Sequence, residues 1–434
     1  MMVKVAFYTL GCKVNHYETE GMMDQFKQAG YQIVDFADKA DIYIIHSCTV
    51  TTEAARKSRQ YARRAKRRNP EARVVMAGCY VQVAPEEIEA IEEIDHMLGT
   101  AGKSEIVELL SDTDDKNLKK IGSYQQLDDY EDLRIFELQE TTRAYIKIEE
   151  GCNQFCSYCI IPYARGPVRS REVDSILEEV NNLIRQGVKE IVLTGIHLGA
   201  FGYDRGEGNA LSSLIQRLLE LGPDFRIRLS SLEVTEVSGE ILSLLAEEER
   251  VCSHLHLPLQ SGSDRILKAM NRPYTGEKFI SKTKKIKKLI PDIAITTDVI
   301  VGFPGETEED FNITRSLIEE IGFSRLHVFP FSRREGTPAA KMANQINGKI
   351  INKRSRELRK LNEELMANFQ RKFLNTVRQV LIEEKKDSEV NLFTGFTDNY
   401  IKVLIEDAEE YCGQLVSVRL EDKYDFQTAR GKII

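Results

Sequence analysis

Two long stretches of the sequence alternate strand patterns with amphipathic helix patterns, and this alternation limits the folds open to the chain. The first stretch is 1–110, and the second runs from Arg143 to about Pro330. Strands that alternate with helices usually lie parallel in a sheet that the helices cover. We therefore predict an α/β multidomain protein that contains two parallel sheets.

Short apolar runs mark the expected strands of the first stretch. The strong candidates are Val3–Thr9, Asp41–His46 and Arg73–Ala77, and a weaker one is Ile33–Phe36. A helix is predicted over His16–Ala29, with Gly30 at its C-terminal end and with Asn15 and Glu18 as an N-cap pair. Together these elements predict an N-terminal parallel sheet of the flavodoxin-like or Rossmann-like type.

The second stretch contains about six strand–helix units. The strand candidates are Ala144–Ile148, Glu190–Leu193, Arg226–Leu229, His254–Leu257, Ala294–Val301 and Arg325–Phe329. One open sheet and an incomplete (β/α) barrel both fit this pattern. In either fold the loops at the C-terminal ends of the strands carry the chemistry, so a site is expected there.

The pattern changes between and after these stretches. Residues 111–133 are polar and acidic, which indicates a linker, with an elaborate surface loop as the alternative. Lys349–Lys372 is a charged helix pattern. The strand patterns that follow it are Val377–Glu383, Leu392–Phe396, Tyr400–Ile405 and Leu415–Leu420. They predict a small β-barrel. The expected domains are therefore 1–110, 134–369 and 370–434, with the linker at 111–133.

The composition is that of a soluble protein. Of the 434 residues, 42% are hydrophobic and 29% are charged, and no run approaches the roughly 18 apolar residues of a membrane helix. The N-terminal residues form a strand pattern and not a signal peptide. We expect a cytoplasmic protein with no membrane partner, in which the eight cysteines serve metals or catalysis and not disulfides.

Three cysteines lie close together in the sequence. Cys152, Cys156 and Cys159 form a C-x3-C-x2-C run directly after a predicted strand. A cubane iron–sulfur cluster usually takes four thiolates, so three would leave one iron with an open position for a substrate. Structural zinc needs a fourth protein ligand, and the candidate is His197, 38 residues after the run. We predict a cluster, with distant-ligand zinc or a metal-free loop as alternatives.

Three further cysteines are dispersed. Cys12, Cys48 and Cys79 each follow a predicted strand and a small residue, and each precedes a predicted helix. Because neighbouring strands lie about 5 Å apart, these thiols are expected to converge on one crevice at the sheet edge. A single cysteine in such a place is often only a small buried hydrophobe. Three at equivalent positions predict a shared metal site, again with an open position, whereas Cys252 and Cys412 are interpreted as ordinary buried thiols.

Several motifs resemble a known family. The cysteine run, with Tyr158 before its last cysteine, resembles the radical S-adenosylmethionine (SAM) signature. The segments that are similar to methylthiotransferases are Thr9–Asn15, Ser47–Val50 and Ala77–Cys79. Gly11–Asn15 and Leu193–His197 resemble the branch that modifies threonylcarbamoyladenosine next to the tRNA anticodon. The similarity covers essentially the whole chain, and its one departure is His46, where Asn is expected near Cys48.

This resemblance implies a fold and a reaction. The central domain would be a partial (β/α)6 radical SAM barrel, and the C-terminal module a TRAM (OB-like) β-barrel. Cys152, Cys156 and Cys159 would hold a [4Fe–4S] cluster that binds SAM, and the dispersed cysteines an auxiliary [4Fe–4S] cluster. A radical from SAM would remove hydrogen from C2 of the adenine, and a methylthio group would be added there with a second SAM. The chemistry would belong to the cofactors, so no catalytic side chain is assigned.

The resemblance also indicates positions that contact SAM, most of them at the C-terminal strand ends. They are Tyr158, Thr194, Gly195, Ser230, Ser231, Glu233, Gln260, Ser261 and Asp298. Arg165 is expected to meet either the SAM carboxylate or an RNA phosphate, because a guanidinium suits both. An ordinary loop or helix-cap role is the alternative for several of them.

A basic helix is the expected RNA contact. Residues 51–70 carry eight basic side chains and one acid in a chain whose net charge is −8. The residues chosen for tRNA contact are Arg56, Arg63, Arg64 and Arg67. Such a one-sided excess favours phosphate contact over a merely solvated face. In the C-terminal barrel Phe393, Phe396 and Tyr400 are expected either to stack on bases or to form its core.

The expected partners are the tRNA anticodon stem-loop and a cellular electron donor, and no DNA. Two alternative functions stay open at this point. The first keeps the chemistry but acts on isopentenyladenosine in tRNA or on a ribosomal protein. The second is a non-catalytic iron–sulfur protein that binds RNA.

Overall fold

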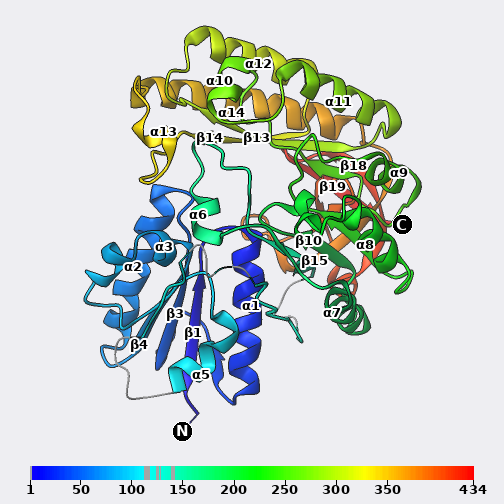
Figure 1. Cartoon of the computed structure of the whole chain (residues 1–434). Helices are drawn as coiled ribbons and strands as arrows, with labels where there is room; N and C mark the ends of the chain where they lie inside the picture. Colours follow the sequence, from blue (N-terminus) through cyan, green and yellow to red (C-terminus); the bar gives the residue numbers. More distant parts are fainter. Residues whose placement is uncertain (1, 112–117, 124–126, 128, 138–141) are drawn as a thin grey trace.

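The chain folds into three parts, which Figure 1 shows in blue to cyan, in green through yellow to the orange helix α14, and in darker orange to red. The structure is a computed structural model that describes residues 2–111, 118–123, 127, 129–137 and 142–434. Much of the acidic segment that was interpreted as a linker therefore lies outside the described residues. None of the described helices combines the length and the apolarity that crossing a membrane requires.

The N-terminal part is built on a parallel sheet with the strand order β2-β1-β3-β4-β5-β6. Its strands are β1 (Lys4–Thr9), β2 (Gln32–Val34), β3 (Ile42–Ser47), β4 (Arg73–Gly78), β5 (His96–Leu98) and β6 (Lys119–Lys120). Its helices are α1 (Lys13–Gln28), α2 (Thr52–Arg68), α3 (Cys79–Val83), α4 (Pro85–Glu89), η1 (Lys103–Glu105) and α5 (Ile106–Ser111). The predicted parallel sheet is confirmed, and β5 and β6 are two short strands that were not predicted.

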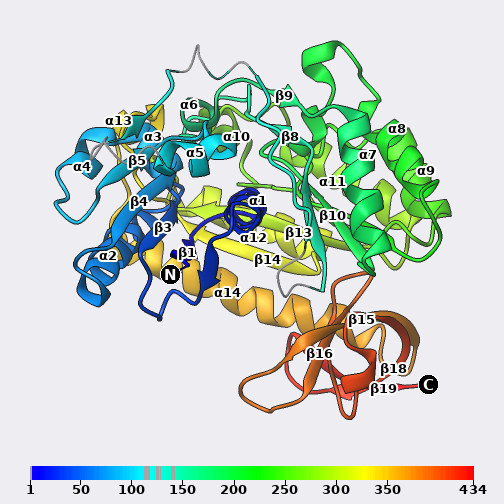
Figure 2. The same ribbon diagram turned by 90° about the horizontal axis from the view of Figure 1, so that it is seen from below.

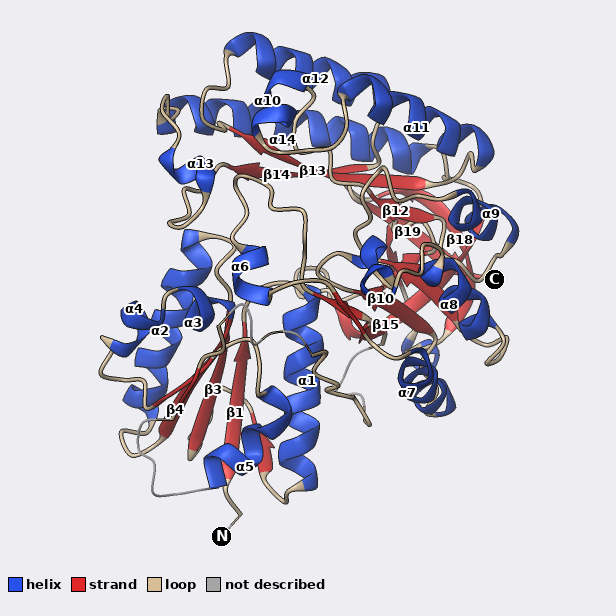
Figure 3. Ribbon diagram, viewed as in Figure 1, coloured by secondary structure: helices blue, strands red, loops and turns tan. Residues whose placement is uncertain are grey.

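Alternating side chains give this sheet two apolar faces, as expected for a sheet covered on both sides. On one face Tyr43 and Met76 pack against α2, α3 and α4. On the other face Ile44 and Val75 pack against α1 and α5. Figure 3 shows the strands between these two groups of helices.

The predicted start of α1 was wrong. The helix begins at Lys13, with Cys12 at the N-cap and no side-chain capping bond. Asn15 and Glu18 therefore lie inside the helix, where both are buried. Asn15 Nδ2 donates to the carbonyl oxygens of Leu10 (2.8 Å) and Ser47 (3.2 Å), so it holds the loops after two strands.

The central part is a partial barrel of six parallel strands, which confirms the (β/α)6 prediction. The strands are β7 (Ala144–Lys147), β10 (Glu190–Thr194), β11 (Arg226–Leu229), β12 (His254–His256), β13 (Ala294–Val301) and β14 (Arg325–Pro330). They form two three-stranded sheets, β7-β10-β11 and β12-β13-β14. The parallel bridges Ile227–Val251 and Ser231–His256 join the two sheets between β11 and β12.

Helices cover the outside of this barrel (Figures 1 and 3). They are α7 (Val173–Arg185), α8 (Ala210–Leu219), α9 (Gly239–Glu247), α10 (Asp264–Ala269), α11 (Gly276–Leu289) and α12 (Glu308–Ile321). Shorter elements are β8 (Glu149–Glu150), β9 (Arg169–Ser170), α6 (Ile161–Arg165), η3 (Leu198–Ala200), η4 (Tyr203–Arg205) and α13 (Pro338–Lys341). The long α14 (Gly348–Arg371) packs along β14.

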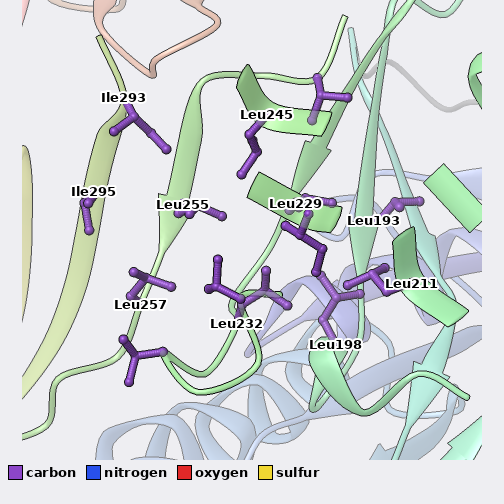
Figure 4. Close-up of a cluster of buried hydrophobic side chains, with 14 of the residues drawn as sticks. Leu193, Leu198, Leu211, Leu229, Leu232, Leu245, Leu255, Leu257, Ile293 and Ile295 are labelled. Carbon is purple, nitrogen blue, oxygen red and sulfur yellow. The ribbon is translucent and has the colours of Figure 1, made fainter. Parts of the chain in front are cut away.

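The core of the central part is made mostly of leucine and isoleucine. Figure 4 shows Leu193, Leu229 and Leu255, from three neighbouring strands, with side chains that meet those of Leu211 and Leu245 from the covering helices. All five are buried. Full burial of one such side chain contributes about 1.5–3 kcal/mol, so this apolar layer is the main support of the barrel.

The C-terminal part is a closed barrel with the strand order β15-β16-β17-β19-β18. The strands are β15 (Val377–Lys386), β16 (Phe393–Thr397), β17 (Lys402–Ile405), β18 (Leu415–Lys423) and β19 (Thr428–Ile433), with the 3-10 turn η5 (Glu409–Tyr411). The small β-barrel is confirmed, and β19, which closes it, was not predicted. Figure 2 shows the barrel beyond the C-terminal end of α14.

A buried charge cluster attaches this barrel to the central part. Glu190 of β10 accepts hydrogen bonds from Arg226 (2.7 Å) and Arg228 (3.0 Å) of β11. The same two arginines donate to backbone carbonyls of the barrel, including those of Phe396 (2.9 Å) and Asp398 (2.7 Å). The guanidinium groups therefore bridge the two domains, and Glu190 balances their charge.

The described residues of the acidic segment are partly built into the fold. Lys119–Lys120 forms β6, and Leu127 and Leu133 are buried. Glu131 lies 3.4 Å from the Lys103 ammonium, and the hydroxyl of Tyr17 in α1 donates to the Leu133 carbonyl. These contacts hold the described residues against the N-terminal part.

Candidate active site

The dispersed cysteines lie together at the C-terminal edge of the N-terminal sheet. Cys12 follows β1 and is exposed, whereas Cys48 follows β3 and Cys79 follows β4, and both are buried. A side chain at Gly11, whose φ is +115°, would approach the Cβ of Cys48 to 2.9 Å. The glycine before Cys12 is therefore required for the close approach of two of these loops.

Arg165 contacts this first cysteine triplet. Its Nε donates to the Cys79 sulfur (3.1 Å), and the other guanidinium nitrogens donate to Glu18 (2.7 Å), Glu150 (2.5 Å) and Asn15 Oδ1 (2.6 Å). The side chain is fully buried. The structure thus places the Arg165 side chain among protein groups beside the dispersed cysteines, and its expected contact with the SAM carboxylate or an RNA phosphate stays a prediction.

Glu18 is the centre of a buried ion-pair cluster around Arg165. Its carboxylate lies 3.1 Å from the Lys147 ammonium and 3.6 Å from that of Lys103. Burial raises the pKa of Glu18, but the three cations outweigh burial and hold the pKa well below its usual range. His46, the residue that departs from the family motif, lies 3.4 Å from Glu18 and contacts Thr19 Oγ1 (3.0 Å). It is therefore part of the same cluster.

The second triplet occupies the loop after β8. Gly151 opens this loop with φ +86°, and a Cβ there would approach the Pro167 carbonyl oxygen to 1.8 Å, so only glycine fits. Cys156 is buried, and Cys152 and Cys159 are half-buried. Burial raises the pKa of the Cys159 thiol to about 12.

Two side chains from distant strand ends reach this loop. Arg272 donates to the Cys156 sulfur (3.3 Å), and its other amine pairs with Glu233. His197 Nδ1 lies 3.9 Å from the Cys152 sulfur, and its Nε2 is 2.5 Å from Glu236. Burial lowers the pKa of His197, but Cys152 and Glu236 outweigh burial and raise it to about 11.

One pocket of about 190 Å³ lies between the loop of Cys48 and the loop of the second triplet, and we call it the cysteine pocket. Its walls include Val50 and Thr51, which follow Cys48, and Tyr158 and Cys159 of the second loop. The remaining walls are Ile160, Ile161, Gln260, Asp298, Ile300, Phe329, Pro330, Phe331, Ser332 and Arg334. A ligand in this pocket would therefore touch the loop that carries Cys48 and the loop that carries the second triplet.

Three of the residues predicted to contact SAM line the cysteine pocket: Tyr158, Gln260 and Asp298. Gln260 has a left-handed φ of +62°, and its buried Oε1 has no hydrogen-bond partner among the described residues. Asp298 lies 3.2 Å from His256 Nε2. An unsatisfied amide oxygen and a carboxylate are thus available at the pocket for a polar ligand.

The other predicted SAM contacts have varied surroundings. The buried hydroxyl of Ser230 has no described partner, and Glu233 is engaged by Arg272. Gly195 packs so tightly on Glu149 that a Cβ would approach the carboxylate to 2.6 Å. Thr194 is buried and Ser231 is exposed. Ser261 Oγ is 3.2 Å from Thr314 Oγ1, so it contacts α12.

Both triplets fit iron–sulfur clusters better than single zinc ions. Four-coordinate zinc, with Zn–S bonds of about 2.3 Å, would hold thiolates about 3.8 Å apart. Among the described residues, neither triplet forms a group whose three sulfurs all lie within 4.8 Å of one another, so neither has the compact arrangement of a zinc site. Each triplet also receives a hydrogen bond from a buried arginine, and such bonds stabilise negative charge on a cluster.

The predicted basic helix is confirmed as α2, whose N-cap Thr51 accepts a hydrogen bond from the Ala54 N–H (3.2 Å). Arg56 pairs with Glu53 (2.6 Å), and Arg63 lies 3.6 Å from Glu93. Arg64 packs over Tyr61, and Arg67 donates to a carbonyl of its own helix. These guanidinium groups remain at the surface, on a helix that begins at the cysteine pocket.

The aromatic residues of the barrel divide between two roles. Phe393 is part of the barrel core. Phe396 lies against the Arg143 guanidinium (5.0 Å), and Tyr400 lies against that of Arg228 (4.2 Å), so both face the central part.

Sequence reasoning did not find Arg272 or Glu18 as site residues, and it weighed His197 only as a distant zinc ligand. Arg272 is 116 residues from Cys156, so no local spacing links the two. Glu18 was instead interpreted as the partner of Asn15 in a helix N-cap. The contacts of Arg272 and His197 form when the central barrel closes, and those of Glu18 form when the N-terminal and central parts meet.

Comparisons with known proteins agree with this geometry. The model of the Radical SAM superfamily matches residues 146–318, and that of the Uncharacterized protein family UPF0004 matches residues 4–99. A solved structure of the radical SAM methyltransferase TsrM from Kitasatospora setae shares the fold, with a TM-score of 0.59, 15% identity, and coverage of 78% of this chain and 77% of that chain.

Curated relatives match over nearly the whole chain. The threonylcarbamoyladenosine tRNA methylthiotransferase MtaB of Bacillus subtilis (strain 168) is 42% identical, over 96% of this chain and 94% of the relative. That of Aquifex aeolicus (strain VF5) is 40% identical, over 96% and 100%. The tRNA-2-methylthio-N(6)-dimethylallyladenosine synthase of Acetivibrio thermocellus is 36% identical, over 95% and 87%. The chain therefore belongs to the radical SAM methylthiotransferases that modify tRNA.

Proposed function

We propose that this enzyme adds a methylthio group to C2 of N6-threonylcarbamoyladenosine next to the tRNA anticodon. The reaction uses two molecules of SAM and two [4Fe–4S] clusters. The main support is the position of the cysteine pocket, which borders both the loop of Cys48 and the loop of the second triplet. The two most similar relatives described above carry the name of this activity.

The two sets of cysteines are the residues that would hold the cofactors. Cys152, Cys156 and Cys159 would hold the cluster that binds SAM, and the dispersed triplet would hold the auxiliary cluster. When bound, these cofactors supply the one-electron chemistry that exchanges an unactivated aromatic C–H bond for a C–S bond.

The chain's own residues position and insulate these groups. Arg272 and Arg165 each donate to a cysteine sulfur and so stabilise the thiolate form. Gln260 and Asp298 present polar atoms to the cysteine pocket, where they can orient SAM. Ile160 and Ile300 line the same pocket and exclude water from a reaction that water would divert.

The tRNA anticodon stem-loop would reach the site along α2, because this basic helix begins at Thr51 on the pocket wall. An electron donor is required for the one-electron chemistry. A cytoplasmic location would suit a tRNA substrate.

A second candidate substrate is the dimethylallyl-type adenosine of tRNA, since the Acetivibrio thermocellus relative carries that name at 36% identity. The relatives described above are named as tRNA enzymes, which favours RNA over a ribosomal protein. They are also named as catalysts, so membership of their family argues against a non-catalytic RNA-binding role.

Nucleoside mass spectrometry of tRNA distinguishes these substrates. In a strain that lacks the gene, 2-methylthio-N6-threonylcarbamoyladenosine should disappear, and the unmethylthiolated nucleoside should accumulate. Restoring the gene should reverse both changes. If this nucleoside is unchanged and the methylthiolated dimethylallyl nucleoside disappears, the second candidate is correct.

The ligand assignment has a separate test in the iron content of the protein. Anaerobically reconstituted enzyme should contain about eight iron atoms per chain, since each triplet holds one cubane. Cys152→Ala, Cys156→Ala and Cys159→Ala together should leave about four and abolish SAM cleavage. Retention of eight irons, or stoichiometric zinc in place of iron, would contradict the assignment.

A further inference from the structure

A second cavity lies where all three parts of the molecule meet. It has a volume of about 440 Å³, and we call it the basic pocket. Lys13 lines it from α1, His254 and His327 from the central strands, Gln370 from α14, and Tyr400 from the barrel. The function proposed above does not yet use these residues.

The basic pocket lies next to the candidate active site on two sides. Lys13 is the residue directly after Cys12, so one wall continues into the first cysteine triplet. On the other side His256 lines the basic pocket, and its Nε2 is 3.2 Å from Asp298, which lines the cysteine pocket. A substrate at the cysteine pocket could therefore extend a substituent into the basic pocket.

The charge of the basic pocket suits an anion. Lys13 is half-buried and makes no hydrogen bond or ion pair with any residue in the described part of the chain. Arg325 lies at the exposed end, and no described carboxylate side chain lines the pocket. A partly buried ammonium group without a protein counter-charge is stabilised by an anionic ligand.

Two buried polar side chains in the pocket have unused hydrogen-bonding atoms. Gln370 is only 2% exposed, and neither its Oε1 nor its Nε2 has a described partner. His254 is 5% exposed; its Nε2 contacts Thr296 Oγ1 (3.1 Å), and its Nδ1 has no partner. Buried polar groups are rarely left unpaired, so these atoms indicate a polar ligand with donors and acceptors of its own.

The remaining walls can hold a flat group. Phe369, Phe396 and Tyr400 line the pocket, and the rings of His254 and Tyr400 are 4.8 Å apart. Aromatic and apolar walls with a few convergent polar groups are typical of small-molecule subsites. The pocket thus combines a cation, an amide, an imidazole and aromatic surface.

We propose that the basic pocket binds the amino-acid substituent on N6 of the target adenine, with the substituent's carboxylate at Lys13 and its carbamoyl or hydroxyl groups at Gln370 and His254. This inference rests on the proposed function and extends it to substrate selection. A dimethylallyl substituent is apolar and has no carboxylate, so it would leave Lys13 and Gln370 unpaired. The pocket therefore favours the threonylcarbamoyl substrate, because a site built for hydrogen bonds rejects an analogue that lacks them.

The first test changes the ligand and leaves the protein intact. Three anticodon stem-loop RNAs are compared, carrying threonylcarbamoyladenosine, its carboxamide analogue, or unmodified adenosine. Binding to anaerobically reconstituted enzyme is measured by fluorescence anisotropy. We expect the carboxamide RNA to bind about tenfold more weakly than the carboxylate RNA, which is the effect of one charge-assisted hydrogen bond. Equal affinities would overturn the proposal.

The second test changes the pocket. Lys13→Met and Gln370→Leu should each remove most of the preference for threonylcarbamoyladenosine RNA over unmodified RNA, and binding of the unmodified RNA should stay unchanged. Lys285→Met, at an exposed lysine of α11, is the matched control and should change neither affinity. A uniform loss with both RNAs would mean that the pocket binds an RNA phosphate, and that result would overturn the proposal.

The two proposals can fail separately. If the wild-type enzyme forms no methylthio product from threonylcarbamoyladenosine RNA, the proposed function is wrong. If it forms the product but reacts equally well with the carboxamide RNA, only the assignment of the basic pocket is wrong. Should Gln370→Leu fail to fold, Lys13→Met and the carboxamide RNA still decide the question.

Discussion

Two buried arginines hold the cysteine loops, and each joins a sulfur to a carboxylate. Arg165 joins Cys79 to Glu18, and Arg272 joins Cys156 to Glu233. In both cases the guanidinium neutralises the charge of the carboxylate and donates a further N–H group to the cysteine sulfur. At the scale of single residues, the sites therefore depend on cations that come from other parts of the chain.

Replacing Arg272 should destabilise the folded protein. Arg272→Met leaves the Glu233 carboxylate without its partner, so we expect the free energy of unfolding to fall by about 3 kcal/mol. Urea unfolding of the reduced, cluster-free protein measures this change. Adding Glu233→Gln should recover part of the loss. The control Arg217→Met removes an arginine whose side chain is 48% exposed and whose partner Asp174 is also exposed, and should cost less than about 1 kcal/mol. Equal losses in the two variants would contradict this account.

The cysteine ligands could be predicted from the sequence, but their supporting residues could not. Cys152, Cys156 and Cys159 lie close together in the sequence, so their spacing can be recognised without knowledge of the fold. Arg272 reaches its sulfur only after the barrel has formed. Asn15 and Glu18 fit a helix cap in the sequence, yet the fold buries both inside α1.

At the scale of elements, α2 connects the cysteine pocket to the surface. Its apolar alanines face the sheet, and its arginines face outward. We expect Arg63→Gln, Arg64→Gln and Arg67→Gln together to weaken tRNA binding and to reduce the slope of log affinity against log salt by about two, since each lost phosphate contact contributes about 0.7–0.9. Binding titrations over a range of salt concentrations measure this slope.

A matched control is available on α11. Lys285→Gln with Lys288→Gln removes exposed charge from a helix on the far side of the central part (Figure 1). This variant should keep the wild-type slope. If both variants reduce the slope equally, the effect is one of general charge, and α2 has no special part in RNA binding.

Elements with a clear apolar period were predictable, and short or polar elements were not. The strands β1, β3 and β4 stand out because their apolar residues are continuous. By contrast, β19 has the sequence TARGKI, in which polar and apolar residues are mixed because buried and exposed positions alternate along most of the strand. The strands β5 and β6 are too short to show any period.

At the scale of the whole molecule, Glu190 couples the central part to the C-terminal barrel. Its side chain is fully buried between arginines that also bind barrel carbonyls. Burial raises the pKa of Glu190, but Arg228, Arg226 and Arg143 outweigh burial and hold the pKa well below its ordinary value of 4.5. The charged carboxylate therefore stabilises the folded state above about pH 4.5, and this stabilisation is lost as the pH falls toward the lower folded-state pKa.

Glu190→Gln should thus destabilise the protein in a pH-dependent way. At pH 7 we expect a loss of about 3–5 kcal/mol in the free energy of unfolding, because three buried arginines lose their counter-charge. Below pH 4.5 the difference from wild type should shrink, because the unfolded wild-type chain then takes up a proton at Glu190 while the folded carboxylate stays charged. Urea unfolding at pH 7 and pH 4 checks this. Glu383→Gln, which removes the more exposed partner of Arg143, should cost less at pH 7. A difference that does not change with pH would contradict the assignment.

The short helix α6 has a consequence for the spacing of the two cysteine loops. It begins two residues after Cys159 and ends at Arg165, which donates to Cys79. One inserted residue in this segment would advance the guanidinium by about 1.5 Å and turn it by about 100°. The length of α6 therefore fixes the distance between the loop of Cys159 and the loop of Cys79. Homologous enzymes that keep both sites should tolerate neither insertions nor deletions in this helix.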